Sequence, residues 1–147
     1  MNPSFSYQID PATRSLQDCL RALEDSAVYQ EMPGSLQFVA ELILDELATN
    51  TLKYGGPDCH EIVFTVDFDG HELRVTLTDD AAPFNPWTDA PVLDDRTVEN
   101  LEDIASGGRG IHMLLQATDS RHYERKDGKN LHILTRNAHR NQDALAA

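Results

Sequence analysis

The sequence predicts one domain that combines helices with antiparallel hairpins, and three observations lead to this fold class. Apolar residues recur at helical spacing between residues 36 and 47, which indicates an amphipathic helix packed on a core. Two later segments of strand-like character are each interrupted by an Asp-Gly pair, at 69–70 and at 127–128. An Asp-Gly pair between such segments predicts a tight hairpin turn, and hairpin strands pair in antiparallel fashion.

The chain has 147 residues, which suits a single domain with a substantial core. Its 12 Lys and Arg against 25 Asp and Glu give a formal net charge of -13. Such an acidic chain binds nucleic acid or an anionic membrane surface poorly, so we expect neither as a partner. Two cysteines without CxxC spacing, no signal-peptide pattern and no apolar run near the ~18 residues of a membrane span together predict a cytoplasmic protein.

The order of the expected elements follows from these patterns. A short strand over 5–9 precedes a first helix, with Asp10 as its N-cap, Pro11 in its first turn and an end before Met32. Ser35 is expected to cap the second helix, which ends at Gly55. Strands over 62–68 and 73–79 follow, and later strands over 120–125 and 130–136. We expect one domain over 1–136 and a frayed tail over 137–147.

Between the two hairpins the sequence predicts a long segment with little regular structure and then a third helix. Residues 79–109 show almost no periodicity, apart from one helical turn expected over 101–104. The glycines at 107–110 are expected to precede the third helix, which is marked by Ile111, Leu114, Leu115 and Thr118. A segment of this length is uncommon in a compact domain and is usually a functional lid or a disordered linker.

A first group of polar residues lies on the second predicted helix. Glu46 and Asn50 are four residues apart at the edge of the apolar stripe, and Lys53 lies one turn further along. Their desolvation is costly unless something polar fills the space beside them, and a metal ion with a phosphate would fill it. The Asn50 oxygen suits Mg²⁺, and Glu46 is placed to accept a proton. A solvated helix face would use the same residue types, so both interpretations remain open.

Two further polar groups follow. Asp79 shares the inward face of its strand by parity, where its carboxylate suits a donor such as the exocyclic amine of adenine. Capping of a turn is the alternative role for such a strand-end Asp. Residues 106–112, SGGRGIH, place glycines ahead of a helix, where backbone N–H groups converge on an anion, and Arg109 adds a guanidinium. A Gly-rich helix start alone is a weak signal.

Taken in order, these groups resemble a known family. ELATNTLKYG resembles the N-box, DDAAPFNPW the first glycine box and GGRGIHMLLQATD the second glycine box of the GHKL ATP-binding superfamily. The PFNPW segment and the closing YERKDGKNLHIL are similar to those of bacterial anti-sigma-factor serine/threonine kinases. The resemblance runs from about Phe5 to Arg136. It implies an α+β two-layer sandwich (the Bergerat or histidine-kinase-like ATPase fold), with a mostly antiparallel sheet covered on one face by helices.

The resemblance also implies roles for individual residues. Glu46 would be the general base, Asn50 the Mg²⁺ ligand and Asp79 the acceptor for the adenine amine. The remaining residues of the implied ATP site are Lys53, Ala81, Phe84, Gly107, Gly108, Arg109, Gly110 and Ile111. The family usually has glycine where this chain has Ala81, so the methyl group is expected to hinder nucleotide binding if the backbone there must approach the base or take a positive φ.

The implied function is that of an ATP- and Mg²⁺-dependent serine/threonine kinase and anti-sigma factor. It would bind a sigma factor and phosphorylate a STAS-type antagonist, with residues 81–108 as a lid that excludes water and is disordered without nucleotide. The alternative is a nucleotide-gated protein-binding regulator with little or no kinase activity, and a stand-alone ATPase is a third hypothesis. A homodimer and a partner other than a sigma factor remain open. The six histidines are expected to be scattered surface and strand residues, not metal ligands.

Overall fold

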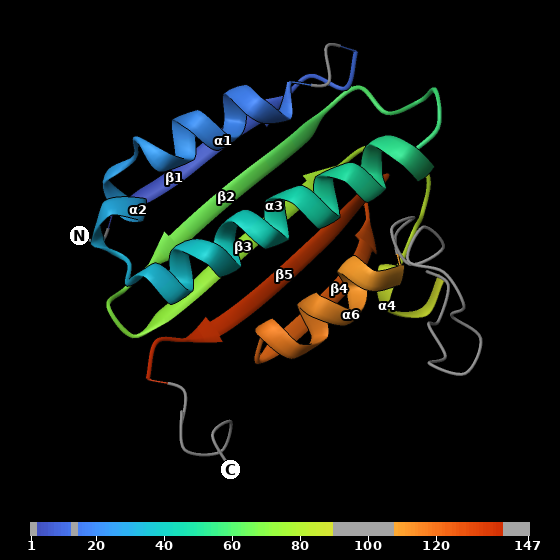
Figure 1. Ribbon diagram of the computed structural model, residues 1–147. Coiled ribbons are helices and arrows are strands. Elements are labelled where there is room, and N and C mark those ends of the chain that lie inside the picture. The colour runs from blue at the N-terminus through green and yellow to red at the C-terminus, as the bar shows by residue number, and fades with distance from the viewer. Residues whose placement is uncertain (1–2, 13–14, 90–107, 140–147) are drawn as a thin grey trace.

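A five-stranded antiparallel sheet forms one layer of the protein, and helices cover one face of that sheet (Figure 1). The computed structural model describes residues 3–12, 15–89 and 108–139. The strand order is β1-β2-β3-β5-β4, and every neighbouring pair is antiparallel. The α+β two-layer sandwich predicted from the sequence is therefore confirmed.

The elements follow the predicted order, with two hairpins that enclose the later helices. Their bounds are β1 (Ser4–Ile9), α1 (Leu16–Glu24), α2 (Ala27–Glu31), α3 (Gly34–Tyr54), β2 (Ile62–Phe68), β3 (Glu72–Asp79), α4 (Pro86–Asp89), α6 (Gly108–Ala117), β4 (Ser120–Lys126) and β5 (Lys129–Asn137). β5 includes Asn137, which the sequence assigned to the tail, and residues 140–147 of that tail lie outside the described residues. Within the described ranges, no helix combines the length and the apolar character needed to cross a membrane.

The hydrophobic core lies between α3 and the central strands. Residues of β2 and β3 alternate between buried and more exposed positions, as the period-two pattern predicted. Cross-strand pairs such as Phe64 with Leu77 and Val66 with Val75 are fully buried. The helix supplies the opposing surface with Leu36, Val39, Ala40, Ile43, Leu44, Leu47 and Ala48. Burial of apolar surface contributes roughly 25 cal/mol per Å², so the packing of α3 on the sheet stabilises the fold.

Two predicted helix starts are wrong. Asp10 does not cap α1, because its carboxylate instead accepts the N–H of Ala12 in a tight turn. α1 begins only at Leu16. Likewise, α3 begins at Gly34, where the carbonyl of Pro33 accepts the first helical hydrogen bonds and Ser35 is already inside the helix.

The first predicted helix is also divided into two. The Ser26 hydroxyl donates to the carbonyl of Leu23 at 2.6 Å and accepts the N–H of Tyr29 at 3.3 Å. A side chain that satisfies backbone groups on both sides favours a helix boundary over a helix interior. The apolar stripe expected over residues 16–27 is therefore shared between α1 and α2.

The segment after β3 contains α4, a short helix that the sequence did not predict. Residues 90–107, which include most of the expected lid, Gly107 and the turn expected over 101–104, lie outside the described residues. α6 begins at Gly108, so Gly108 and Gly110 lie in its first turn and do not precede it as predicted. Leu115, one of the residues that marked this helix in the sequence, is 43% exposed, whereas Ile111 and Leu114 are buried.

Candidate nucleotide-binding site

The predicted polar residues converge where α3 meets the end of β3 and the start of α6. On α3, the hydroxyl of Thr51 lies 3.4 Å from the Asp79 carboxylate at the end of β3. About one turn earlier on the same helix, the Glu46 carboxylate lies directly against Gly110 of α6. Asn50 lies beside Thr51 and is buried. Three segments that are far apart in the sequence thus form one polar site.

Asp79 is a buried carboxylate, only 2% exposed. Its Oδ1 accepts the backbone N–H of Ala81 at 3.0 Å and the side-chain amide of Asn130 at 2.8 Å. Burial raises the pKa of the Asp79 carboxyl, because the charged form is desolvated, while these hydrogen bonds act in the opposite direction. The second oxygen, Oδ2, has a longer contact of 3.4 Å with the Thr51 hydroxyl. The inward orientation predicted from strand parity is confirmed.

Asn130, on β5, is a site residue that the sequence analysis missed. It faces Asp79 in the register of β3 and β5 and is 2% exposed. Besides Asp79, its amide group donates to the carbonyl of Ala82 at 3.0 Å, and its oxygen accepts the Tyr123 hydroxyl at 2.6 Å. From β4, Arg125 donates to the carbonyl of Ala81 at 2.6 Å. The second hairpin therefore holds the backbone that follows Asp79.

His132 was also missed as a site residue, although it lies on a strand, β5, in agreement with the expectation of surface and strand histidines. Its side chain lines a small pocket beside Asp79 and is 3% exposed. The Nε2 atom of His132 lies 3.9 Å from Asp79 Oδ2. Burial lowers the pKa of His132 to about 4, so the ring is neutral near pH 7. The alternation with Leu134 was a usable signal, because residues 130, 132 and 134 must share one face of a strand.

Ala81 does not show the backbone strain that would require glycine. Asp127 is the one residue other than glycine with a positive φ in the described ranges, so Ala81 has an ordinary backbone. The Ala81 side chain is buried and packs beside Gly55. If residue 55 carried a methyl group, its Cβ would lie 2.8 Å from the Cβ of Ala81, which is too close. Gly55 therefore provides the space that the alanine methyl occupies.

The pocket beside Asp79 is polar and small. It is lined by Asn50, Thr51, Gly55, Asp79, Ala81, Ala82, Phe84, Asn130 and His132, and its volume is about 10 Å³. That is room for roughly one water molecule. Among the described residues, the buried amide nitrogen of Asn50 has no hydrogen-bond partner there, which is costly unless a polar group fills the space. The lining fits a polar ligand group chemically, but a nucleobase enters only if part of the wall moves.

Phe84 and Tyr54 form an aromatic pair next to this pocket. Their rings stack with centroids 5.0 Å apart and an interplanar angle of 20°. Phe84 also lines the pocket, so this ring is part of the wall that must move. Lys53, at the exposed end of α3, has its ammonium 5.1 Å from the Tyr54 ring centroid. The predicted residues Lys53 and Phe84 thus lie on the same side of the site.

Glu46 packs against the N-terminal turn of α6. A methyl group added to Gly110 would lie 1.6 Å from Glu46 Oε2, so only glycine fits under this carboxylate in its present position. Burial, and to a smaller degree the nearby Asp45, raises the pKa of the Glu46 carboxyl. The structure therefore brings the predicted base and the second glycine box into direct contact. Ile111, by contrast, places its side chain in the hydrophobic core.

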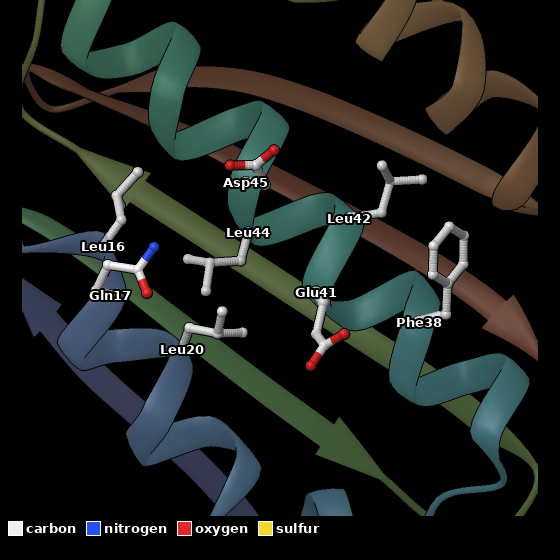
Figure 2. A pocket seen from close by; sticks show the side chains of 8 residues that line it. All are labelled: Leu16, Gln17, Leu20, Phe38, Glu41, Leu42, Leu44 and Asp45. Atoms are coloured by element: carbon white, nitrogen blue, oxygen red, sulfur yellow. The ribbon is translucent and has the colours of Figure 1, made fainter.

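A wider hollow of about 270 Å³ lies elsewhere, on the outer side of the helix layer (Figure 2). It is lined by Leu16, Gln17, Leu20, Phe38, Glu41, Leu42, Leu44 and Asp45. Figure 2 shows leucines of α1 and α3 facing one another across the gap between the two helices. Among these eight residues there are two carboxylates and no cationic side chain, which would repel a triphosphate. This hollow is therefore not the nucleotide site.

Helices cover one face of an antiparallel sheet, and a buried Asp lies at a strand end beside α3, an arrangement that fits an ATPase- or kinase-like domain. Residues 8–136 match the histidine kinase-like ATPase domain family, and the chain belongs to this family. The chain is also similar to the serine/threonine-protein kinase BtrW of Bordetella bronchiseptica, with 25% identity over 132 residues. That alignment covers 88% of this chain and 91% of BtrW. The family predicted from the sequence motifs is confirmed.

Proposed function

We propose that this protein is a serine/threonine protein kinase that uses ATP and Mg²⁺ and acts as an anti-sigma factor. In this proposal it binds a sigma factor and phosphorylates a STAS-type antagonist protein. The kinase activity is supported by the family of the domain and by its similarity to BtrW, a protein named as a serine/threonine kinase. The sigma factor and its antagonist are supported by the resemblance of the sequence motifs alone.

The observation that carries the nucleotide part is the buried carboxylate of Asp79. Its Oδ1 is held by two N–H donors at 2.8 and 3.0 Å, whereas Oδ2 has a hydroxyl at 3.4 Å. A ligand amine that enters past Ala82 and Phe84 would give Oδ2 a stronger donor. The exocyclic amine of adenine is such a donor, and the histidine kinase-like ATPase family of the domain favours ATP over other nucleotides that carry an amine.

Glu46 is the residue that would accept the proton of the attacking hydroxyl group. Its raised pKa brings the carboxylate closer to the range in which a base holds a proton during transfer. The first turn of α6, against which it lies, presents backbone N–H groups that attract phosphate oxygens. The base and an anion-attracting helix start are therefore adjacent.

Asn50 would hold Mg²⁺ through its amide oxygen, together with phosphate oxygens and water. The side chain is buried at the pocket, and within the described ranges its amide nitrogen has no hydrogen-bond partner, which fits a polar occupant beside it. Mg²⁺ commonly takes only one or two protein ligands in such sites. When bound, the ion would neutralise charge that develops on the phosphate oxygens.

A second candidate function is a nucleotide-gated binding regulator without useful kinase activity. The small pocket favours it, because about 10 Å³ beside Asp79 does not admit a nucleobase in this conformation. In that case a partner would bind through the helix layer or the open sheet face, and nucleotide would only bias the conformation. Transfer of phosphate to a partner protein separates the two candidates.

Calorimetry with ATP, in the presence and absence of Mg²⁺, tests the proposal first. We expect Mg²⁺-dependent binding by the parent protein, strong loss of that binding in Asn50→Ala and little change in Asn137→Ala, a matched control on the exposed end of β5. Glu46→Gln should still bind ATP but lose phosphate transfer to the STAS-type antagonist proteins of the same genome. No binding at ~1 mM ATP, an affinity of only about -4 kcal/mol, would contradict the proposal.

A further inference from the structure

Asn130 is the residue most closely joined to the predicted adenine acceptor. It lies opposite Asp79 on the neighbouring strand and is 2% exposed. Its Nδ2 donates to Asp79 Oδ1 at 2.8 Å. A hydrogen bond to a buried, charged acceptor is among the stronger ones in proteins. The position of the Asp79 carboxylate therefore depends on this amide.

The orientation of the Asn130 amide is fixed by its surroundings. The Tyr123 hydroxyl donates to its oxygen at 2.6 Å, and its nitrogen also donates to the carbonyl of Ala82 at 3.0 Å. A flipped amide would place its oxygen against the Asp79 carboxylate and this carbonyl, where every neighbour is an acceptor. The donor end of Asn130 therefore always faces Asp79.

This arrangement leaves the two oxygens of Asp79 unequal. Oδ1 accepts from Asn130 and from the backbone of Ala81. Oδ2 is 3.4 Å from the Thr51 hydroxyl, which also donates to the carbonyl of Leu47 at 3.0 Å, and 3.9 Å from His132 Nε2. Because one hydroxyl hydrogen cannot serve both acceptors at once, Oδ2 is the oxygen available to a ligand.

We propose that Asn130 is a positioning residue that sets base selectivity, because it ties Asp79 Oδ1 so that Oδ2 presents a pure acceptor to the ligand. The proposal rests on the proposed nucleotide site and deepens it. With Asn130 in place, a purine with an amine at position 6 finds an acceptor, whereas a purine with an oxygen there faces a second acceptor. Selectivity for ATP over inosine triphosphate, which has that oxygen, follows directly.

Loss of Asn130 would weaken this selectivity in two ways. The carboxylate could rotate, because the Ala81 N–H at 3.0 Å would be the one short hydrogen bond left to it among the described residues. The hydrogen bond from Asn130 also favours the ionised form of Asp79 against the effect of burial. A protonated carboxyl group is a donor as well as an acceptor, so it would accommodate the oxygen of inosine as readily as the amine of adenine.

The test compares the affinities for ATP and inosine triphosphate by calorimetry at pH 7, with Mg²⁺ present. For Asn130→Ala we expect ATP binding about tenfold weaker, as for loss of one hydrogen bond to a charged group. Binding of inosine triphosphate should change less than about twofold, so the selectivity ratio should fall about tenfold. Asn137→Ala, an exposed position on the same strand, should leave both affinities unchanged.

Tyr123→Phe provides a second variant that keeps the ring and removes only the hydroxyl that orients Asn130. We expect a selectivity ratio roughly threefold lower than in the parent protein, in the same direction, as for a neutral hydrogen bond. This variant decides the matter if Asn130→Ala does not fold, which thermal unfolding followed by circular dichroism would reveal.

Three results would overturn the proposal. The first is a parent protein that binds ATP and inosine triphosphate equally well. The second is an equal weakening of both nucleotides in Asn130→Ala, which would indicate only a damaged pocket. The third is no change in either affinity. In all three cases ATP binding by the parent protein would leave the proposed function standing, whereas a parent protein that binds neither nucleotide would contradict both proposals.

Discussion

At the scale of single residues, the contact between Glu46 and Gly110 joins the expected base to the first turn of α6. An added methyl group at residue 110 would lie 1.6 Å from the Glu46 carboxylate. We predict that Gly110→Ala lowers phosphate transfer at least tenfold. The carboxylate is the end of a flexible side chain and would move aside, so the free energy of unfolding should fall by less than about 1 kcal/mol.

The matched control for this change is Gly34→Ala, because nothing lies within 4 Å of a methyl group added there. Rates of transfer and urea unfolding curves measure the two effects separately. Full activity in Gly110→Ala would mean that the position of Glu46 in this structure is not the one used in catalysis. A large loss of stability would mean instead that the backbone of α6, and not the side chain, gives way.

The buried ring of His132 should make the free energy of unfolding depend on pH. Its pKa is lowered by burial from 6.5 to about 4, so the unfolded chain binds a proton more tightly than the folded protein. The stability from this neutral ring is complete above about pH 6.5 and falls by about 3 kcal/mol by pH 4. The neighbouring Asp79 has a raised pKa, so it binds protons more readily when folded and offsets part of this loss.

Urea unfolding between pH 4 and 7 measures this slope. In His132→Gln the slope should be shallower by up to one proton, about 1.4 kcal/mol per pH unit. Asn137→Ala, at an exposed and uncharged position on the same strand, serves as the control and should keep the slope of the parent protein. An identical slope in His132→Gln would show that the neutral buried ring is not what loses stability in acid.

The sequence could predict a residue of the site only where that residue's position follows from its own helix or strand. Glu46 and Asn50 share one helix, and Asp79 continues the parity of its own strand, so their placement followed from short-range periodicity. Asn130 meets Asp79 only because β5 lies next to β3, across 51 positions of sequence. A hairpin pattern shows that two strands pair with each other, but not which of them pairs with an earlier strand.

At the scale of elements, the end of α6 is held by two arginines from the second hairpin. Arg121 Nη1 lies 3.0 Å from the carbonyl and 2.9 Å from the hydroxyl of Thr118, and Arg136 donates to the carbonyl of Ala117 at 2.7 Å. Cations at a helix C-terminus satisfy its free carbonyl groups and its dipole. We predict that Arg121→Ala lowers the free energy of unfolding by about 1–2 kcal/mol.

Urea unfolding midpoints at constant slope measure the effect. Arg74→Ala is the control, because Arg74 forms an exposed ion pair with Glu72 at 3.6 Å, and such pairs contribute less than about 1 kcal/mol. Equally small decreases in the free energy of unfolding for both variants would contradict the prediction. The hydrogen bonds of Arg121 to the end of α6 would then contribute no more stability than an exposed ion pair.

Helices and strands were predicted correctly where hydrophobic periodicity was the dominant signal. The prediction was wrong where the hydrogen bonds of a single side chain ended a helix that the periodicity continued. The strands around Asp69-Gly70 were correct because burial alternates without interruption along both. The division between α1 and α2 was missed because the apolar stripe continues through Ser26, whose hydroxyl nevertheless bonds to backbone groups on both sides. Hydrophobic periodicity locates the buried face of a helix better than its ends.

At the scale of the whole molecule, an excess of negative charge surrounds one continuous core. The formal net charge is -13 on a chain of 147 residues. Folding brings these charges closer together than they are in the unfolded chain, so their repulsion destabilises the compact state. The exposed pair Arg74–Glu72 offsets little of it.

Screening of this repulsion should therefore stabilise the protein. The Debye length falls from about 30 Å at 0.01 M salt to below 10 Å above 0.1 M, which is shorter than the width of such a domain. Between 0.01 and 0.3 M NaCl we predict that the free energy of unfolding by urea rises by on the order of 1 kcal/mol at pH 7. At pH 5.5, nearer the sequence pI of about 4.6, fewer charges remain and the rise should be smaller. A decrease with added NaCl at pH 7 would mean that attractive ion pairs outweigh the net repulsion.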